Sequence, residues 1–160
     1  MLKFFKPRPI EIYSPLDGET ISINKINDQV FSQGMVGEGV AIIPQSTEII
    51  SPVDGTVSII AETNHSVCIV TKEGLELIIH YGLDTVKYKG KGFEMKVKVG
   101  QRVNKGDVLF KADDQFFKER NVDLTSPVLV LNGDDFIVEN INTKENIKAG
   151  KDILFMVKSR

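Results

Sequence analysis

The segment HSVCIVTKEGLELIIH, residues 65–80, decides most about the fold. Two runs rich in aliphatic and β-branched residues flank a polar stretch that ends in glycine, a pattern that predicts two antiparallel strands joined by a tight turn. If Val70 faces Leu75 across the turn, His65 pairs directly with His80, and their Cβ atoms lie about 5 Å apart. These are the only two histidines in the chain. The segment therefore predicts a β-hairpin that carries a two-histidine site.

Strand alternation indicates which face the histidines occupy. Leu75, Leu77 and Ile79 point to one side, and this wholly aliphatic set is expected in the core. The other side carries Glu76, Ile78 and His80, a set that includes a charge, so His80 is expected at the surface beside an apolar neighbour. The pairing depends on register, because a slip of one residue sends the side chains of one strand to the opposite face.

Short aliphatic runs recur along the rest of the chain, punctuated by 13 glycines and six prolines. Many short strands with turn signals at this spacing predict an all-β fold, an antiparallel sandwich or barrel. The only stretch with helical character is 113–122, so one or two short helices are expected. The predicted strands cover residues 40–43, 49–50, 57–60, 67–70, 75–79, 108–111, 128–131 and 153–157.

Two motifs occur twice. The sequence SPLDGE at residues 14–19 returns as SPVDGT at 51–56, and the pair VKVG and DVLF around residues 97–110 returns as IKAG and DILF around 147–155. Proline sets φ at the first central position of a turn and glycine supplies positive φ near its end, so Pro-x-Asp-Gly is turn chemistry. The chain is therefore expected to contain an internal duplication.

Length and charge limit the class of protein. A chain of 160 residues is expected to form a single domain, residues 10–160, after a flexible N-terminal tail, residues 1–9. A net charge of −2 without a basic stripe argues against nucleic-acid binding. The lone Cys68 excludes a disulfide framework and is expected to be buried. No stretch approaches the roughly 20 apolar residues of a membrane span, and no signal peptide is evident, so the chain is expected in the cytoplasm.

The N-terminal tail has an alternative interpretation. Its basic and aromatic residues could form a short foot for an anionic membrane surface rather than a frayed end. The foot would consist of Leu2, Lys3, Phe4, Phe5 and Lys6.

From about residue 10 to the C-terminus, the chain resembles the glucose-type enzyme IIA domain of the bacterial phosphoenolpyruvate–sugar phosphotransferase system. Cys68 stands where related chains often carry an aromatic residue. The motifs that carry the resemblance are VGEGVAI at 36–42, SPVDGT at 51–56, ETNH at 62–65, HYGLDTV at 80–86, GKGF at 90–93, and GQRV at 100–103 followed by KGD at 105–107.

The resemblance implies a β-sandwich built on a duplicated hybrid motif, in agreement with the repeats. It implies that His80 is the phosphoryl acceptor and His65 the assisting histidine, and Thr63, Asp28 and Asp84 match as well. The implied activity is that of a phosphotransferase: a phosphoryl group comes from the phosphohistidine of HPr and passes to a cysteine of the IIB domain of a sugar permease at the inner face of the membrane. Metabolic or transport proteins regulated by the phosphorylation state are further implied partners.

The residues support such a relay. A neutral imidazole nitrogen is nucleophilic near pH 7, so His80 would attack through Nε2. His65 would donate an N–H to a phosphoryl oxygen, Thr63 would orient a ring through its hydroxyl, and the backbone N–H of Gly82 would add a donor. The sequence has no phosphate-binding loop and no kinase signature, so the donor must already be activated.

Both transfer partners need a docking face. An apolar ring around the histidines is expected, with Asp28 and Asp84 beside it, although aliphatic residues on short strands often prove to be core. The expected ring consists of Val30, Phe31, Met35, Val36, Ile78 and Val86.

Two other functions compete with the relay. Two adjacent histidines suit a zinc hydrolase, but catalytic zinc usually has three protein ligands, and no third histidine lies nearby. A carboxylate such as Asp84 is a poor candidate for the missing ligand. The resemblance implies that phosphoryl transfer requires no cofactor. It also suggests a limited role for zinc, in which His65 and His80 bind Zn²⁺ together with an acidic side chain from a partner. The second competitor is a lipoyl- or biotin-type carrier, because residues 100–107 are typical of such domains; Lys72 lies at the hairpin tip but lacks the usual neighbours.

Overall fold

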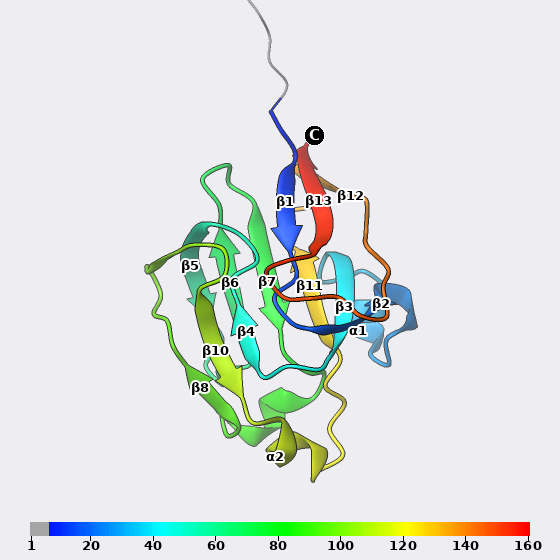
Figure 1. Ribbon diagram of the computed structural model, residues 1–160, viewed down its shortest axis with the longest axis vertical. Helices are drawn as coiled ribbons and strands as arrows, with labels where there is room; N and C mark the ends of the chain where they lie inside the picture. Colours follow the sequence, from blue (N-terminus) through cyan, green and yellow to red (C-terminus); the bar gives the residue numbers. More distant parts are fainter. Residues whose placement is uncertain (1–6) are drawn as a thin grey trace, which may run out of the picture.

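Three antiparallel sheets account for most of the residues that the computed structural model describes, 7–160 (Figure 1). This confirms the predicted all-β fold with its duplicated motif and short helices. The largest sheet has seven strands in the order β2 (Gly18–Ser22), β3 (Glu38–Pro44), β11 (Ser126–Val130), β7 (Glu76–His80), β6 (Ser66–Val70), β5 (Gly55–Ile60) and β9 (Arg102–Val103).

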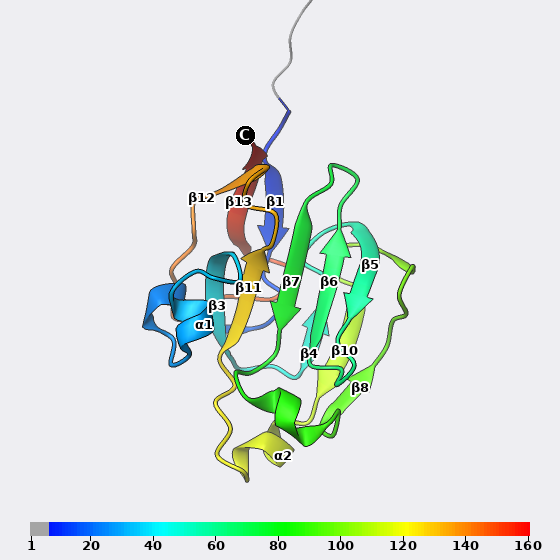
Figure 2. The ribbon, with the colours of Figure 1, turned by 180° about the vertical axis from the view of Figure 1, so that it is seen from behind.

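The two smaller sheets lie over the same side of the large one, as the opposite views of Figures 1 and 2 show. One has the order β1 (Ile10–Tyr13), β13 (Ile153–Ser159), β12 (Phe136–Glu139), and the other β4 (Glu48–Ile50), β10 (Val108–Ala112), β8 (Phe93–Met95). The remaining elements are the helices α1 (Gln29–Ser32) and α2 (Asp114–Lys118) and the 3₁₀ turns η1 (Ile23–Lys25) and η2 (Thr85–Tyr88).

The main core fills the space between these sheets. Side chains from every sheet contribute to one contiguous cluster of buried apolar residues, among them Ile12, Val40, Leu77, Leu109 and Phe155. Removal of this apolar surface from water is the main term that stabilises such a fold. The open face of the large sheet is left to carry the site.

The internal duplication appears as repeated hydrogen bonding. In each Ser-Pro-x-Asp-Gly copy the serine is fully buried, and its hydroxyl donates to the carbonyl two residues further on, at 2.6 and 2.7 Å. The aspartate of each copy accepts a backbone N–H from the second repeated segment. Asp17 accepts from Ala149 at 2.8 Å, and Asp54 accepts from Lys105 at 2.7 Å.

The register of the β6–β7 hairpin differs from the predicted one by one residue. Val70 pairs with Glu76, and Ser66, rather than His65, pairs with His80. The cause is the turn: the Thr71 N–H donates to the Leu75 carbonyl at 3.0 Å, and the Leu75 N–H donates to the Thr71 hydroxyl at 3.2 Å. Leu75 is therefore part of the turn instead of the first residue of the strand.

The faces of β7 nonetheless match the predicted alternation. Leu75, Leu77 and Ile79 are completely buried, and Ile78 and His80 lie half-buried on the other side. Because of the shifted register, Cys68 pairs with Ile78 and not with Leu77. Cys68 is buried, as expected from its apolar surroundings.

Helix α2 is shorter than predicted. The sequence predicts a helix over 113–122, but Asn121 adopts a left-handed φ of 57° and the Val122 N–H donates back to the Phe117 carbonyl, which ends α2 early. The proposed membrane foot, from Leu2 to Lys6, lies outside the described residues. Within residues 7–160, no helix is both long and apolar enough to cross a membrane.

Candidate functional site

His80 is the last residue of β7, at the end of the large sheet where β6 begins (Figure 2). Its Nδ1 lies 2.8 Å from the carbonyl oxygen of Gly82. A carbonyl oxygen only accepts hydrogen bonds, so Nδ1 carries the proton and Nε2 keeps its lone pair. The local backbone therefore leaves free the nitrogen through which attack is expected.

His65 lies beside it, in the bend that precedes β6. The two ring centroids are 4.6 Å apart, and the ring planes meet at 74°. The predicted closeness of the imidazoles is thus confirmed despite the changed register. Strand alternation does not apply to His65, because it follows Asn64 with its left-handed φ of 57° and lies outside the strand, and its carbonyl accepts the Tyr81 N–H at 2.8 Å.

Thr63 holds the ring of His65. Its Oγ1 lies 2.6 Å from Nδ1 of His65. A hydroxyl both donates and accepts, and when it donates to Nδ1 the proton of the neutral ring is on Nε2. In that state His65 presents an Nε2–H donor next to the Nε2 lone pair of His80.

Both rings are held in the neutral form. Burial is the largest cause that lowers the pKa of His80, to about 4, and the neighbouring His65 lowers it further, against the opposing effects of the Gly82 carbonyl and Asp28. Burial also lowers the pKa of His65. At neutral pH the site therefore contains two uncharged imidazoles, the form in which one is a nucleophile and the other a hydrogen-bond donor.

Gly82 contributes its carbonyl oxygen to the site, whereas the sequence predicted that it would contribute its N–H. The N–H is already engaged, because it donates to the hydroxyl of Ser126 at 3.1 Å. The expectation that this amide binds a phosphoryl oxygen is therefore wrong. The sequence did not single out Ser126, which lies 44 residues away on β11.

The predicted apolar ring divides into exposed and buried members. Val30, Met35 and Val86 have exposed fractions of 52, 72 and 47% and can meet a partner. Val36 and Ile78 are half-buried against a small second core beneath α1.

Phe31, the aromatic member of the predicted ring, is mostly buried and packs against His80. It is 8% exposed, and its ring centroid lies 5.1 Å from that of His80 in an edge-on arrangement. Helix α1 has only four residues, so one side chain turns inward to the second core while its neighbour Val30 remains outside. Phe31 therefore packs edge-on against the His80 ring.

The two aspartates have different surroundings. Asp28 is the N-cap of α1, where its carboxylate accepts the N–H groups of Val30 at 3.0 Å and Phe31 at 3.4 Å. It is near enough to His80 to influence its pKa. The side chain of Asp84 is 73% exposed and lies 3.9 Å from Lys87.

Metal binding by this chain alone is not favoured by the donor set. Within residues 7–160, no group of three or more His, Cys, Asp or Glu side chains is placed to hold an ion. Both Nε2 atoms suit Zn²⁺, and both Nδ1 atoms already have the outer hydrogen bonds typical of metal-bound histidines, but they amount to two ligands.

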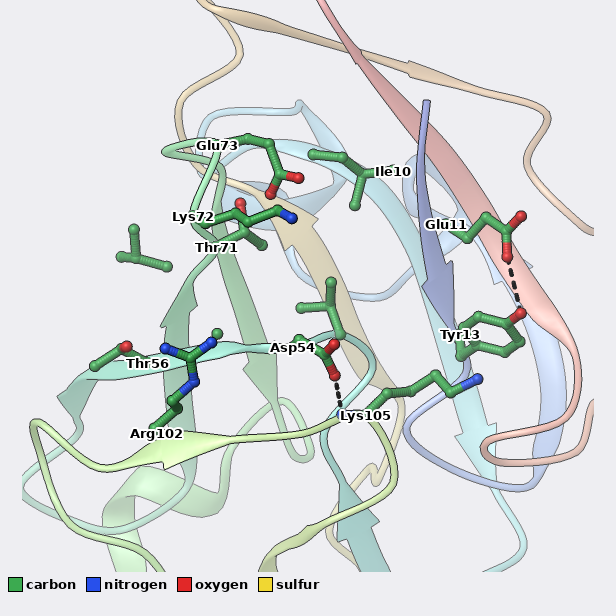
Figure 3. Close-up of a pocket in the computed structure, with 13 residues that line it drawn as sticks. Ile10, Glu11, Tyr13, Asp54, Thr56, Thr71, Lys72, Glu73, Arg102 and Lys105 are labelled. Atoms are coloured by element: carbon green, nitrogen blue, oxygen red, sulfur yellow. Dashed lines mark hydrogen bonds between the residues drawn. The ribbon is translucent and has the colours of Figure 1, made fainter. Parts of the chain in front are cut away.

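A cleft of the described structure lies away from the histidines. It measures about 640 Å³ and lies at the other end of β6 and β7, around the hairpin tip, β1 and β9 (Figure 3). Its lining shares no residue with the histidine site. It contains the cations Lys72, Arg102 and Lys105 and the carboxylates of Glu11, Asp54 and Glu73, so its charges balance.

Comparisons with known proteins agree with this geometry. A family model described as phosphoenolpyruvate-dependent sugar phosphotransferase system, EIIA 1, matches residues 10–136. The "PTS system glucose-specific EIIA component" of Buchnera aphidicola subsp. Acyrthosiphon pisum is 43% identical over 133 residues, which is 83% of this chain and 83% of the relative. The component of the same name from Borreliella burgdorferi is 36% identical over 84% of this chain and 71% of the relative.

A longer relative and a solved structure extend the comparison. The "PTS system glucose-specific EIICBA component" of Staphylococcus carnosus is 36% identical over 91% of this chain, which spans only 21% of that relative. The solved structure of the glucose permease IIA from Mycoplasma capricolum superimposes with a TM-score of 0.86 at 31% identity, covering 96% of this chain and 99% of that one.

Proposed function

The chain belongs to the EIIA 1 family of the phosphoenolpyruvate-dependent sugar phosphotransferase system, and from this premise we propose that it is a phosphocarrier with His80 as its acceptor. The donor would be the phosphohistidine of HPr, and the final acceptor a cysteine of the IIB domain of a glucose-type sugar permease. The chain would work in the cytoplasm and meet the permease at the inner face of the membrane. Metabolic or transport proteins that read its phosphorylation state are further partners under this proposal.

The observation that carries the proposal is the pairing of an unprotonated Nε2 on His80 with the neighbouring imidazole of His65. The lone pair of His80 Nε2 attacks the phosphorus atom, and the bond between phosphorus and the nitrogen of the HPr histidine breaks, leaving its electron pair on that nitrogen. Phosphoryl transfer needs little from the protein beyond positioning and stabilisation of charge. No nucleotide or metal is required for this step.

The neighbours of His80 meet the charges that develop. Because Nδ1 keeps its proton while Nε2 bonds to phosphorus, the ring becomes positive, and the Gly82 carbonyl lies 2.8 Å from the atom that carries the proton. His65 Nε2–H donates to an oxygen of the transferring group when the Thr63 hydroxyl donates to Nδ1. The site therefore supplies an acceptor for the ring and a donor for the phosphoryl group.

Onward transfer uses the same site in reverse. A cysteine thiolate of the IIB domain attacks phosphorus, the bond to Nε2 breaks, and His80 returns to its neutral form. The exposed side chains of Val30, Met35 and Val86 supply the apolar contact area. The name of the Staphylococcus carnosus relative joins an A component to B and C components, which supports B as the partner.

Zinc has a limited place in the proposal. If a partner contributes an acidic side chain, His65 and His80 would be the two ligands from this chain, and the ion would bridge the two proteins without taking part in phosphoryl transfer. Such binding would compete with transfer, because it uses the same Nε2 atoms.

The test is a mass measurement. Purified chain is incubated with phosphoenolpyruvate, HPr and the enzyme that uses phosphoenolpyruvate to phosphorylate the histidine of HPr. The intact mass of the chain is recorded in the complete mixture and with each component omitted in turn. The expected result is the gain of a single phosphoryl group that is acid-labile and stable to alkali. No gain in the complete mixture would overturn the proposal, and a zinc hydrolase or a lipoyl-type carrier would give that result.

A further inference from the structure

The hydrogen bond that His80 donates from Nδ1 is accepted by a backbone carbonyl, that of Gly82. Gly82 has φ of +76°, and a Cβ added there would lie 2.5 Å from Cγ2 of Thr85, so the position requires glycine. Glycine is also the residue whose backbone has the most freedom. A carbonyl that fixes a catalytic ring from such a position needs restraints from elsewhere in the fold.

Two hydrogen bonds supply these restraints, one on each amide that flanks Gly82. The Gly82 N–H donates to the hydroxyl of Ser126 at 3.1 Å. The Leu83 N–H, which belongs to the same peptide plane as the Gly82 carbonyl, donates to the Asp123 carbonyl at 2.9 Å. Asp123 lies in the segment that leads into β11, and Ser126 is the first residue of that strand.

The hydroxyl of Ser126 is oriented for this purpose. Ser126 is completely buried, and its Oγ donates its own hydrogen to the Leu124 carbonyl at 2.7 Å. The oxygen lone pair is therefore directed at the Gly82 N–H. A chain of three hydrogen bonds thus runs from Leu124 through Ser126 and Gly82 to Nδ1 of His80.

We propose that Ser126 is a positioning residue that fixes the tautomer of His80 through the backbone of Gly82. The inference rests on the proposed function only in taking His80 as the nucleophile. Without the serine hydroxyl, the Gly82 peptide loses one of its two anchors and its carbonyl can turn away from Nδ1. The proton is then free to move to Nε2, where it blocks the attacking lone pair.

The first measurement reads the tautomer and needs no phosphoryl transfer. Long-range ¹H–¹⁵N correlation spectra at pH 8 show which ring nitrogen carries the proton, and the chain has only two histidines to resolve. We expect a single Nδ1–H form of His80 in the parent. Ser126→Ala should give a mixed population with Nε2–H, and Ser126→Thr, which restores the hydroxyl, should return the parent pattern.

The second measurement is the rate of phosphorylation by phospho-HPr. Ser126→Ala should lower kcat about tenfold. KM for phospho-HPr should stay within about twofold, since the buried Ser126 cannot touch a partner. Ser51→Ala is the matched control: Ser51 is equally buried and donates to the Val53 carbonyl, but it belongs to the repeated turn motif and not to the histidine site.

The outcomes separate this inference from the proposed function. If the parent accepts no phosphoryl group, the proposed function fails, while the tautomer spectra still decide the role of Ser126. An unchanged His80 spectrum in Ser126→Ala, or equal losses of rate in Ser51→Ala, would overturn the positioning role. If the alanine variant does not fold, Ser126→Cys keeps the volume, replaces the hydroxyl by a weak acceptor, and carries the same expectation.

Discussion

His65 and His80 lie with ring centroids 4.6 Å apart, yet the two imidazoles bond through Nδ1 to groups of different kinds. The partner of His80 is a carbonyl oxygen, which can only accept, and the partner of His65 is a hydroxyl, which can also donate. Because the two Nδ1 partners differ, the two Nε2 atoms can take opposite roles in transfer. His80 keeps a lone pair on Nε2, and His65 can present a proton there.

His80 is predicted to be the acceptor. His80→Ala should fold, because the side chain is half-buried at the open face of the large sheet and outside the main core. It should take up no phosphoryl group in the mixture with HPr, the kinase of HPr and phosphoenolpyruvate. Intact mass and circular dichroism check the two expectations. A stable label on another residue of the folded variant would contradict the assignment.

His65 is predicted to assist transfer and not to accept the group. His65→Gln keeps a side-chain donor but loses the imidazole, so HPr should still phosphorylate His80 while onward transfer to IIB slows by about 100-fold or more. Thr63→Val, which removes the hydroxyl that orients the ring, should slow the same step less, by about tenfold. Rapid-quench rates of both half-reactions decide this. Parent rates in both variants would make His65 and Thr63 bystanders.

The faces of the strands could be predicted from the sequence, but the register could not. Alternation depends only on local pleating, and Leu75, Leu77 and Ile79 are all buried as that rule requires. Register depends on how the turn closes, and the hydrogen bonds between Thr71 and Leu75 are set by a few atoms that no hydrophobic pattern records.

The site itself was predictable to the extent that it is encoded by side chains close in sequence. His65, His80 and Thr63 were found because they are chemically distinctive and near one another along the chain. Ser126 was not found, because it acts 44 residues away through a backbone amide. The burial of Phe31 could not be predicted, because a four-residue helix gives no periodicity from which its inward face could be inferred.

The free energy of unfolding is predicted to decrease as the pH is lowered, because His80 is buried in its neutral form. Its pKa is about 4 in the folded chain, mainly because of burial, and about 6.5 when unfolded. Between these values the unfolded state binds the proton and the folded state does not, so stability is fully present above pH 6.5 and is lost as pH falls toward 4. The loss from this group amounts to about 3 kcal/mol.

Urea denaturation of the parent and of His80→Ala at pH 7, 6, 5 and 4.5 measures this effect. The variant should lose less stability than the parent over the same range, whatever its offset at pH 7. Parallel curves for the two proteins would show that His80 titrates normally in the folded state.

Asp28 and Asp84 are predicted to act on the encounter with HPr. Asp28 is near enough to His80 to influence its pKa, and Asp84 follows His80 by four residues with its side chain exposed. A carboxylate near the acceptor repels a phosphoryl group, so we expect the two aspartates to meet a basic rim on the partner. Charges at the rim change mainly the association rate and are screened over about 8–10 Å at physiological salt. Val30, Met35 and Val86 are exposed and are proposed to supply the apolar contact area, so binding should weaken without being lost.

The structure also determines which variants are informative. Asp28 caps α1, so replacing it by lysine would disturb the helix that carries Phe31 against His80, and a loss of rate would then have two causes. Asp28→Asn keeps a good cap and removes the charge, and Asp84→Asn changes a side chain that is 73% exposed. Asp134→Asn combined with Asp135→Asn, at exposed positions of the loop between β11 and β12, is a control with the same change in net charge. The double variant should be phosphorylated by HPr several-fold more slowly at low salt, with a flatter salt dependence, whereas the control should match the parent. Stopped-flow rates at 20 and 500 mM salt decide between this and simple solvation: if the double variant follows the parent at both, the two aspartates have no part in partner choice.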